Sequence, residues 1–422
     1  MIARTLLSRR RLLATAVVIT AALLGLTACS AASSSPPSSS SSGTVMSWSQ
    51  IETAAKGQTV NLWMYGGDQQ GDSYVDKHLI PAAAKVGVTL KRVPITDTKD
   101  ALNRILSEKQ AGVTRGTVDL VWVNGSNFGT GKQADAWKCN WTPLLPNMKY
   151  TNPDDPLLKN DFGTPVDGCE APWHKAQFLL AYNAATVKDP PHSFGELAEW
   201  ITAHPGRFTY PAPPDFTGSV FVREMLYSTA GGYMNVPLTF SQKSYDQLTP
   251  ALYKKLNDLK ASLWKSGQTY PQSSEALNQL YADKQVDFTM TYGPATLTDL
   301  VDNGTYPPDT TVATFTEGTV GNASFLAIPS TSGASAGAMV VANLALSPRQ
   351  QALAADPKVW GQFTVLDLAK LPENDRTVFR KLPHSAVVPS YDLLSRNANP
   401  ELSAAWVPAL DDGWRANVLA SQ

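Results

Sequence analysis

Residues 59–68 read TVNLWMYGGD, and this stretch decides the class of fold. Its first seven residues are mainly β-branched, aromatic or aliphatic, and they predict a strand that stops at the glycine pair. Comparable runs at 88–93 (VTLKRV) and 118–123 (VDLVWV) predict two further strands, with helix-spaced apolar residues between the three. Strands of this kind, alternating with helices, are typical of a parallel sheet covered on both faces. We therefore predict an α/β unit at 59–123.

A second α/β unit follows in the sequence. Strands are predicted at 178–183, 207–210 and 286–292, and helices at 194–203, 249–266 and 273–283. A further strand at 324–328 leads through a small-residue loop at 329–338 into a helix at 339–355. A chain of 422 residues is long enough for two such units.

The overall charge argues against one class of partner. The chain has 35 Lys and Arg against 36 Asp and Glu, a net charge of −1. Binding to nucleic acid through its phosphates needs a basic surface, so we expect no nucleic-acid partner. The five histidines and three cysteines show no His-x-x-x-His or Cys-x-x-Cys spacing. We expect no metal ion, and we expect no cofactor.

The amino terminus predicts export to the outside of the cytoplasmic membrane. Residues 1–28 combine a basic start with an apolar run and form a secretory signal. The sequence LTAC that ends at Cys29 resembles a bacterial lipobox, in which Cys29 is lipidated. The alternative is a plain signal peptide with an incidental cysteine. Residues 8–13 (SRRRLL) are similar to a twin-arginine motif, so the Sec and Tat routes both stay open.

A serine-rich segment separates the signal from the folded body. Residues 29–45 hold the lipidated cysteine and a stretch of polar chain that cannot bury apolar surface, which predicts a flexible tether. With Cys29 committed to lipid, Cys139 and Cys169 remain as an even pair in an oxidising compartment. This favours a disulfide over two free thiols.

One short motif suggests an enzyme. Residues 333–337 match Gly-x-Ser-x-Gly around Ser335, and Asp356 or Asp367 and then His384 follow in the order of a hydrolase triad. A nucleophile elbow needs its strand to run directly into the turn, whereas residues 329–332 intervene here. A cell-surface serine hydrolase is therefore kept only as the alternative hypothesis.

Several segments resemble one known family when taken in order. They are 57–67 (GQTVNLWMYGG), 118–128 (VDLVWVNGSNF), 170–173 (EAPW), 205–217 (PGRFTYPAPPDFT) and 337–348 (GAMVVANLALSP). They resemble the YnjB-like branch of ABC-transporter solute-binding proteins, whose wider relatives bind thiamine, iron, polyamines or sugars. The resemblance covers residues 50–420. It departs from the branch at Cys139 and Cys169, and at Tyr292-Gly293-Pro294, where a polar Asn-Pro is more usual.

The resemblance implies a two-lobed periplasmic-binding-protein fold of type II, with a ligand cleft between lobes that are joined by crossing segments. The lobes would be 46–182 and 183–323, with 324–422 returning to the first lobe and ending in helices. The partners implied are a small solute and the permease and ATPase subunits of an ABC importer. Such a protein would be a monomer without enzymatic activity, held to the membrane by its lipid.

The candidate ligand-binding residues follow predicted strands or open predicted helices, since ligands of open α/β sheets bind beyond the carboxyl ends of the strands. They are Tyr65, Gly66, Gly67, Asp68, Asn124, Ser126, Asn127, Tyr182, Asp215, Phe216, Thr217 and Tyr292. For the aspartates the alternative is helix capping, for Asn and Ser it is turn chemistry, and for Tyr182 it is the core. Aromatic faces together with Asp68 favour a planar cationic solute, such as a thiamine-like compound.

Overall fold

The computed structural model describes residues 46–383, 385–390, 393–394 and 398–420. The predicted signal peptide, Cys29 and the whole serine-rich tether lie outside these residues, and so does His384 of the hydrolase hypothesis. Within the described ranges, no helix combines the length and the apolar character that a membrane span requires.

The larger sheet contains the three strands predicted first, and they are parallel as expected. Its path is β11 (Ala398–Pro400), β10 (Thr319–Ala327), β3 (Leu120–Val123), β1 (Thr59–Tyr65) and β2 (Thr89–Ile95), with β6 (Glu170–Gln177) paired to β10. β1 pairs in parallel with β2 and β3, and β10 runs antiparallel to β3 and β6. The carboxyl ends of β1 and β3 therefore lie at one edge of this sheet.

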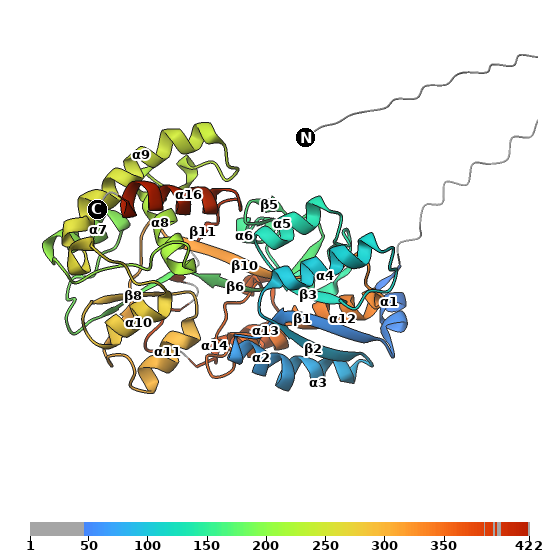
Figure 1. Cartoon of the computed structure of the whole chain (residues 1–422). Helices are drawn as coiled ribbons and strands as arrows, with labels where there is room; N and C mark the ends of the chain where they lie inside the picture. The colour runs from blue at the N-terminus through green and yellow to red at the C-terminus, as the bar shows by residue number, and fades with distance from the viewer. Residues whose placement is uncertain (1–45, 384, 391–392, 395–397, 421–422) are drawn as a thin grey trace, which may run out of the picture. The chain divides into compact units, whose positions relative to one another are not determined.

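The smaller sheet has the order β8 (Phe288–Thr291), β7 (Leu179–Asn183) and β9 (Thr310–Val312), and all of its pairs are antiparallel. β4 (Asn160–Asp161) and β5 (Thr164–Pro165) form a separate hairpin. Figure 1 shows β10 and β6 running side by side between the helices that surround the two sheets.

Helices cover both sheets. Those of the first lobe, which packs around Leu62 and Leu120, are α1 (Trp48–Ala55), α2 (Gln69–Tyr74), η1 (Val75–Leu79), α3 (Ile80–Lys85), α4 (Thr98–Gln110), α5 (Ser126–Gln133), η2 (Thr142–Leu144), η3 (Pro146–Tyr150), α6 (Pro156–Lys159), α12 (Ser335–Ala345), α13 (Pro348–Ala355), η7 (Leu368–Lys370) and α14 (Glu373–Arg380). Those of the second lobe, around Leu180 and Phe221, are α7 (Phe194–Ala203), α8 (Phe216–Thr229), η4 (Tyr233–Asn235), α9 (Gln242–Leu259), η5 (Lys260–Ser262), η6 (Trp264–Gly267), α10 (Ser274–Ala282), α11 (Pro294–Asp302), α16 (Trp406–Trp414) and η8 (Arg415–Leu419).

Strand β10 passes from one hydrophobic core to the other. Val320, near its start, packs in the core of the second lobe, whereas Leu326 packs in that of the first. β6 accompanies it in the opposite direction, from Glu170 opposite Ala327 to Gln177 opposite Gly321. The two strands are thus the crossing segments that the resemblance implied.

The expected lobe boundaries differ from the structure in two places. The boundary at 182 falls inside β7, which pairs entirely within the second sheet, so the chain changes lobe at Phe178. The return segment also does not end in the first lobe. Trp406, Leu410 and Trp414 of α16 are buried in the second core, because α16 packs along α8.

Two local predictions are wrong as well. Residues 207–210 form no strand, because the backbone carbonyls of Arg207 and Phe208 accept single hydrogen bonds from Asp287 and Trp264 rather than joining a ladder. The helix predicted at 339–355 is instead two helices, α12, which begins earlier at Ser335, and α13, which begins at Pro348. Proline at this position cannot continue the first helix.

Cys139 and Cys169 are joined by a disulfide that closes a loop with a sequence separation of 30 residues. Cys169 is buried in the core formed by α4, Phe128 and Trp137. The crosslink therefore ties the chain after α5 to the start of the crossing strand β6.

Replacing both Cys139 and Cys169 with alanine is expected to lower the free energy of unfolding of the exported chain by about 3 kcal/mol, because a loop of this length then regains its entropy in the unfolded state. Urea unfolding followed by circular dichroism measures the change. An unchanged midpoint, or two titratable thiols in the untreated protein, would contradict the crosslink.

Candidate functional site

The turn after β1 forms one side of the candidate site. The Gly66 amide donates to the carbonyl of Ile95 at 2.9 Å. A side chain on Gly67 would collide with Tyr65, because its Cβ would lie 2.2 Å from the Tyr65 hydroxyl. The tyrosine ring is therefore folded back over the glycine turn, and Tyr65 remains 47% exposed.

Asp68 caps a helix and also binds an indole. Its Oδ1 accepts the Gly71 amide at the start of α2 at 2.9 Å, and its Oδ2 accepts the Trp360 Nε1–H at 2.7 Å. Both oxygens thus have partners within the first lobe, as the capping alternative predicted. Trp360 is fully buried, and its ring stacks on Tyr74 with centroids 5.1 Å apart.

The loop after β3 provides the second cluster of candidates. Gly125 has a φ of 64°, and its amide donates to the Asp161 carboxylate at 2.7 Å. Asn124 lies 3.4 Å from the Ser324 hydroxyl on β10, and Ser126 and Asn127 begin α5. Ser126 is exposed and Asn127 half-buried, so their polar groups are accessible at the carboxyl edge of the sheet.

Sequence reasoning missed an aromatic cluster next to these two turns. Trp122, at the end of β3, contacts Trp173, His174 and Trp360 with edge-on geometry and centroid distances of 5.4–6.1 Å. His174 and Trp173 come from the crossing strand β6. The sequence could have indicated Trp122, because side chains two residues apart on a strand project from the same face and Trp122 is two residues before the candidate Asn124.

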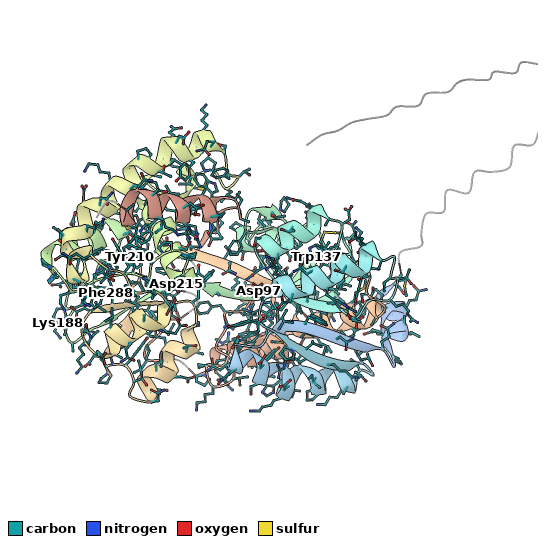
Figure 2. The ribbon with its side chains drawn as sticks, in the orientation of Figure 1. Asp97, Trp137, Lys188, Tyr210, Asp215 and Phe288 are labelled. Atoms are coloured by element: carbon teal, nitrogen blue, oxygen red, sulfur yellow. A yellow bond between two sulfur atoms is a disulfide. The ribbon has the colours of Figure 1, made fainter. Side chains whose placement is uncertain are left out.

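In the second lobe, Asp215 joins two helix amino termini. It accepts the Thr217 and Gly218 amides of α8 at 3.0 Å, and the Ser274 amide at the start of α10 at 2.8 Å. The buried Thr217 hydroxyl also donates to it. Figure 2 shows Asp215 on the side of the second lobe that faces the first lobe. The label of Asp97 marks the first lobe in the same view. Asp215 thus caps α8, as its capping alternative predicted, whereas Thr217 is buried beneath this cap.

Phe216 and Tyr292 form a ring pair. Their centroids are 4.9 Å apart at 62°, and Phe216 is 49% exposed. The Tyr292 hydroxyl donates to the carbonyl of Val320 on β10 at 3.3 Å. Burial, and next the nearby Glu401 carboxylate, raises the pKa of Tyr292 well above its ordinary value, so the hydroxyl stays protonated and remains a donor.

The structure does not bring Tyr182 to this pair. Leu179 faces Thr291 in the antiparallel ladder, whereas Tyr182 faces Phe288, three residues further from the crossing strand. Its ring lies 6.0 Å from the Phe288 ring and packs against the core of the second lobe. Tyr182 is therefore a partly buried residue at the edge of the second core, which is closer to its core alternative than to a place in the Phe216–Tyr292 pair.

Two contacts join the lobes beside the candidate residues. The Gln70 side-chain amide on α2 donates to Asp299 on α11 at 2.6 Å. A Cβ on Gly361, next to Trp360, would lie 2.5 Å from the Ala295 side chain at the start of α11. A cavity of about 700 Å³ adjoins this contact, and its lining includes Ala295 and Thr298 of α11 together with Leu382 and Val388. None of the twelve predicted residues lines it.

A family model described as bacterial extracellular solute-binding protein matches residues 81–377. The chain belongs to this family. It is 35% identical over 369 residues to Protein YnjB of Escherichia coli K12, and this match covers 87% of the chain and 92% of YnjB.

Solved structures share the fold. A crystal structure of an ABC transporter from Clostridium perfringens matches with a TM-score of 0.60 at 16% identity, covering 85% of this chain and 98% of that one. The spermidine/putrescine substrate-binding protein PotD from Streptococcus pneumoniae matches with a TM-score of 0.61 at 14% identity, covering 86% and 100%. The two-lobed type II fold of this solute-binding protein is thereby confirmed.

The hydrolase hypothesis finds no support in the geometry. β10 ends at Ala327, eight residues before Ser335, so no strand runs directly into a nucleophile turn. The Ser335 hydroxyl lies 3.4 Å from the carbonyl of Ser332, at the start of α12. Among the described residues there is also no cluster of three or more His, Cys, Asp or Glu that could hold a metal ion.

The buried ring of His174, in the aromatic cluster with Trp122, makes the stability of the fold sensitive to acid. Burial lowers the pKa of His174 from 6.5 to about 3, so the buried ring stays neutral in the folded protein. The folded state binds fewer protons than the unfolded state between these values, so stability is lost as the pH falls below 6.5. The free energy of unfolding of the wild type is expected to fall by about 2 kcal/mol between pH 6.5 and about pH 5 because of His174. Replacing His174 with phenylalanine should abolish this fall.

Urea unfolding of the wild type and this variant at both pH values measures the difference. Other groups titrate equally in both proteins, so the comparison isolates His174. Equal pH dependence in the two proteins would contradict its burial as a neutral ring.

Proposed function

We propose that this solute-binding protein captures a small solute between the turn edge of the first lobe and the Phe216–Tyr292 ring pair of the second. The turn edge comprises Tyr65–Asp68 and Asn124–Asn127. Contacts from the solute to both lobes would favour the closed arrangement, and the loaded protein would deliver its solute to the permease and ATPase subunits of an ABC importer.

The exposed aromatic side chains carry this proposal. Tyr65 and Phe216 are about half exposed, although both are large rings with apolar faces. Each is held in place by its own lobe, Tyr65 by the glycine turn and Phe216 by the Tyr292 ring. Rigid, accessible rings offer a large contact area at little entropic cost when a ligand arrives.

The Gln70–Asp299 hydrogen bond and the Gly361–Ala295 approach support closure at this place. They involve elements immediately after the candidate turns: α2 follows Asp68, and α11 follows Tyr292. Small movements about β6 and β10 would therefore change the spacing of the candidate residues directly.

The solute class we propose is a planar cation, such as a thiamine-like compound. Aromatic faces attract cations through their quadrupole, by about 0.5–2 kcal/mol for each ring, depending on desolvation. Asp68 and Asp299 supply negative charge on the two sides. Neither Asp68 nor Asp215 would bind the cation directly. The oxygens of Asp68 already accept the Gly71 amide and the Trp360 indole, and those of Asp215 bind the amino termini of α8 and α10, so Asp68 would act through its charge alone.

Titration with thiamine, monitored by tryptophan fluorescence, tests the proposed solute class. Trp122 is half-buried next to the turn after β3, so a bound solute is expected to change its emission. Replacing Phe216 with alanine should weaken binding about tenfold, because it removes one ring from the pair. Met234→Ala is the matched control, since Met234 is a highly exposed apolar residue of the second lobe.

Saturable binding of a neutral sugar, with no response to thiamine or other cationic ring compounds, would contradict the proposed solute. Equal affinity of the Phe216→Ala and Met234→Ala variants for thiamine would show that Phe216 does not contact the solute.

We also propose that the protein is anchored on the outer face of the cytoplasmic membrane through lipidated Cys29, with the serine-rich segment to residue 45 as its tether. The extracellular family supports the compartment, and the LTAC sequence supports the anchor. Replacing Cys29 with serine is expected to move the protein from the membrane fraction to the soluble one, as fractionation and immunoblotting would show. Retention of the variant in the membrane fraction would contradict lipid anchoring.

A further inference from the structure

Trp122 lies between the two turns that form the turn edge of the first lobe. It is the third residue of β3 and comes two residues before Asn124. The centroid of its ring is 6.1 Å from that of Trp360, and the Trp360 indole donates to Asp68 in the turn after β1. Trp122 therefore connects the turn after β3 with the turn after β1.

Three rings hold Trp122 from one side. Trp173, His174 and Trp360 contact it edge-on, at interplanar angles of 69–89°. The centroids of these three rings are 4.5–5.6 Å from one another, so all three lie on the same side of Trp122. They are buried, whereas Trp122 is only half-buried. The exposed part of Trp122 is therefore on the side that these rings leave open, and packing fixes its orientation.

The indole N–H of Trp122 also differs from those of the buried tryptophans. The Trp141 Nε1–H donates to the carbonyl of Cys169 at 3.2 Å, and the Trp173 Nε1–H is buried without a partner. The Trp122 Nε1–H has no partner within the described part of the chain either, but it is not buried. It is therefore available to donate a hydrogen bond to a bound molecule.

The surroundings of Trp122 favour a positively charged ligand. The Asp68 carboxylate is bonded to a ring of the same cluster. His174 is neutral, because burial lowers its pKa to about 3. Lys175, the next residue of β6, projects from the opposite face of the strand, where it pairs with Asp155. The rings that contact Trp122 thus add no positive charge, and the open face of an indole attracts a cation through its quadrupole.

We propose that Trp122 is a specificity-determining residue of the first lobe, which contacts a planar cationic solute with its open ring face and its indole N–H. This assignment rests on the proposed function, because it places Trp122 at the turn edge between Tyr65–Asp68 and Asn124–Asn127. When the lobes close, a solute held on Trp122 would face the Phe216–Tyr292 ring pair of the second lobe.

Fluorine NMR of the mature protein labelled with 5-fluorotryptophan tests this assignment. The Trp122 resonance is identified by its loss in Trp122→Phe, and the Trp264 resonance, identified in the same way, is the control. Trp264 is also half-buried, but it packs against the core of the second lobe, with Lys265 over its ring. The probes are thiamine and N-methylnicotinamide, which are planar cations, and nicotinamide, which is a neutral ring of nearly the same shape as N-methylnicotinamide.

The Trp122 resonance should shift saturably with both cations, whereas the Trp264 resonance should not move. Half-saturation with nicotinamide should need a concentration about tenfold higher than with N-methylnicotinamide, because the neutral ring lacks the charge. Calorimetric titration then compares the variants for the cation that binds more tightly. Trp122→Leu removes the ring and should weaken binding about tenfold, Trp122→Phe keeps a ring and should weaken it about threefold, and Trp264→Leu should bind as the wild type does.

A Trp122 resonance that responds to neither cation, or equally to nicotinamide, would overturn the assignment. Equal affinity of Trp122→Leu and Trp264→Leu for the cation would also overturn it. A response of Trp122 to N-methylnicotinamide without one to thiamine would support the assignment and reject only a thiamine-like solute. Saturable binding of a neutral sugar with no change at Trp122 would overturn the assignment, but capture of a small solute between the lobes would still stand.

Discussion

The peptide of Val320 is the point on which the rest of the structure depends. It opens β10, where the chain leaves the second lobe for the first, and three groups hold it. The Glu224 carboxylate accepts its amide at 2.6 Å, while the Phe178 amide and the Tyr292 hydroxyl donate to its carbonyl at 2.8 and 3.3 Å. A buried peptide group with strong partners on both sides is costly to displace. The crossing strand therefore starts from a fixed position in the second lobe.

Tyr292 connects this anchor to the candidate site. Its hydroxyl binds the crossing strand, whereas its ring supports Phe216 at the exposed edge. Burial keeps the hydroxyl protonated, so the donor remains present across physiological pH. A solute that presses on the ring pair thus acts on a residue bonded to the start of β10. Under the proposed function, these contacts would link solute binding to the angle between the lobes.

The first lobe has a corresponding arrangement. Trp360 binds Asp68 through its indole, and the next residue, Gly361, approaches Ala295 of the second lobe. Both aspartates that open helices at the site, Asp68 and Asp215, are already bonded within their own lobes. Their role is to fix the turns, and the exposed rings and amides beside them remain available for a solute.

Local patterns predicted the three parallel strands of the larger sheet and the end of β10, but they missed β6 and β11 and the long-range contacts. Strands β1, β2 and β3 follow from runs of β-branched and apolar residues, and Asp215 as a helix cap follows from its position before α8. The sequence could not place Tyr182, because its distance from Tyr292 depends on the antiparallel register of β7 and β8. It also could not find Trp360 or Asp161 as partners of the turns, since these residues are 292 and 36 positions from the groups they bind. Such pairs arise from tertiary packing, which cannot be predicted from the spacing of residues along the chain.

The central claim is that the two lobes close on a solute, and a distance between them tests it most directly. Spin labels at Gln110→Cys in the first lobe and Lys188→Cys in the second occupy exposed positions outside the candidate site. Pulsed electron paramagnetic resonance then gives the distance between the two labels, without thiamine and with thiamine at a saturating concentration. Closure predicts a shorter and narrower distance distribution when the solute is bound. An unchanged distribution in the presence of bound solute would contradict closure.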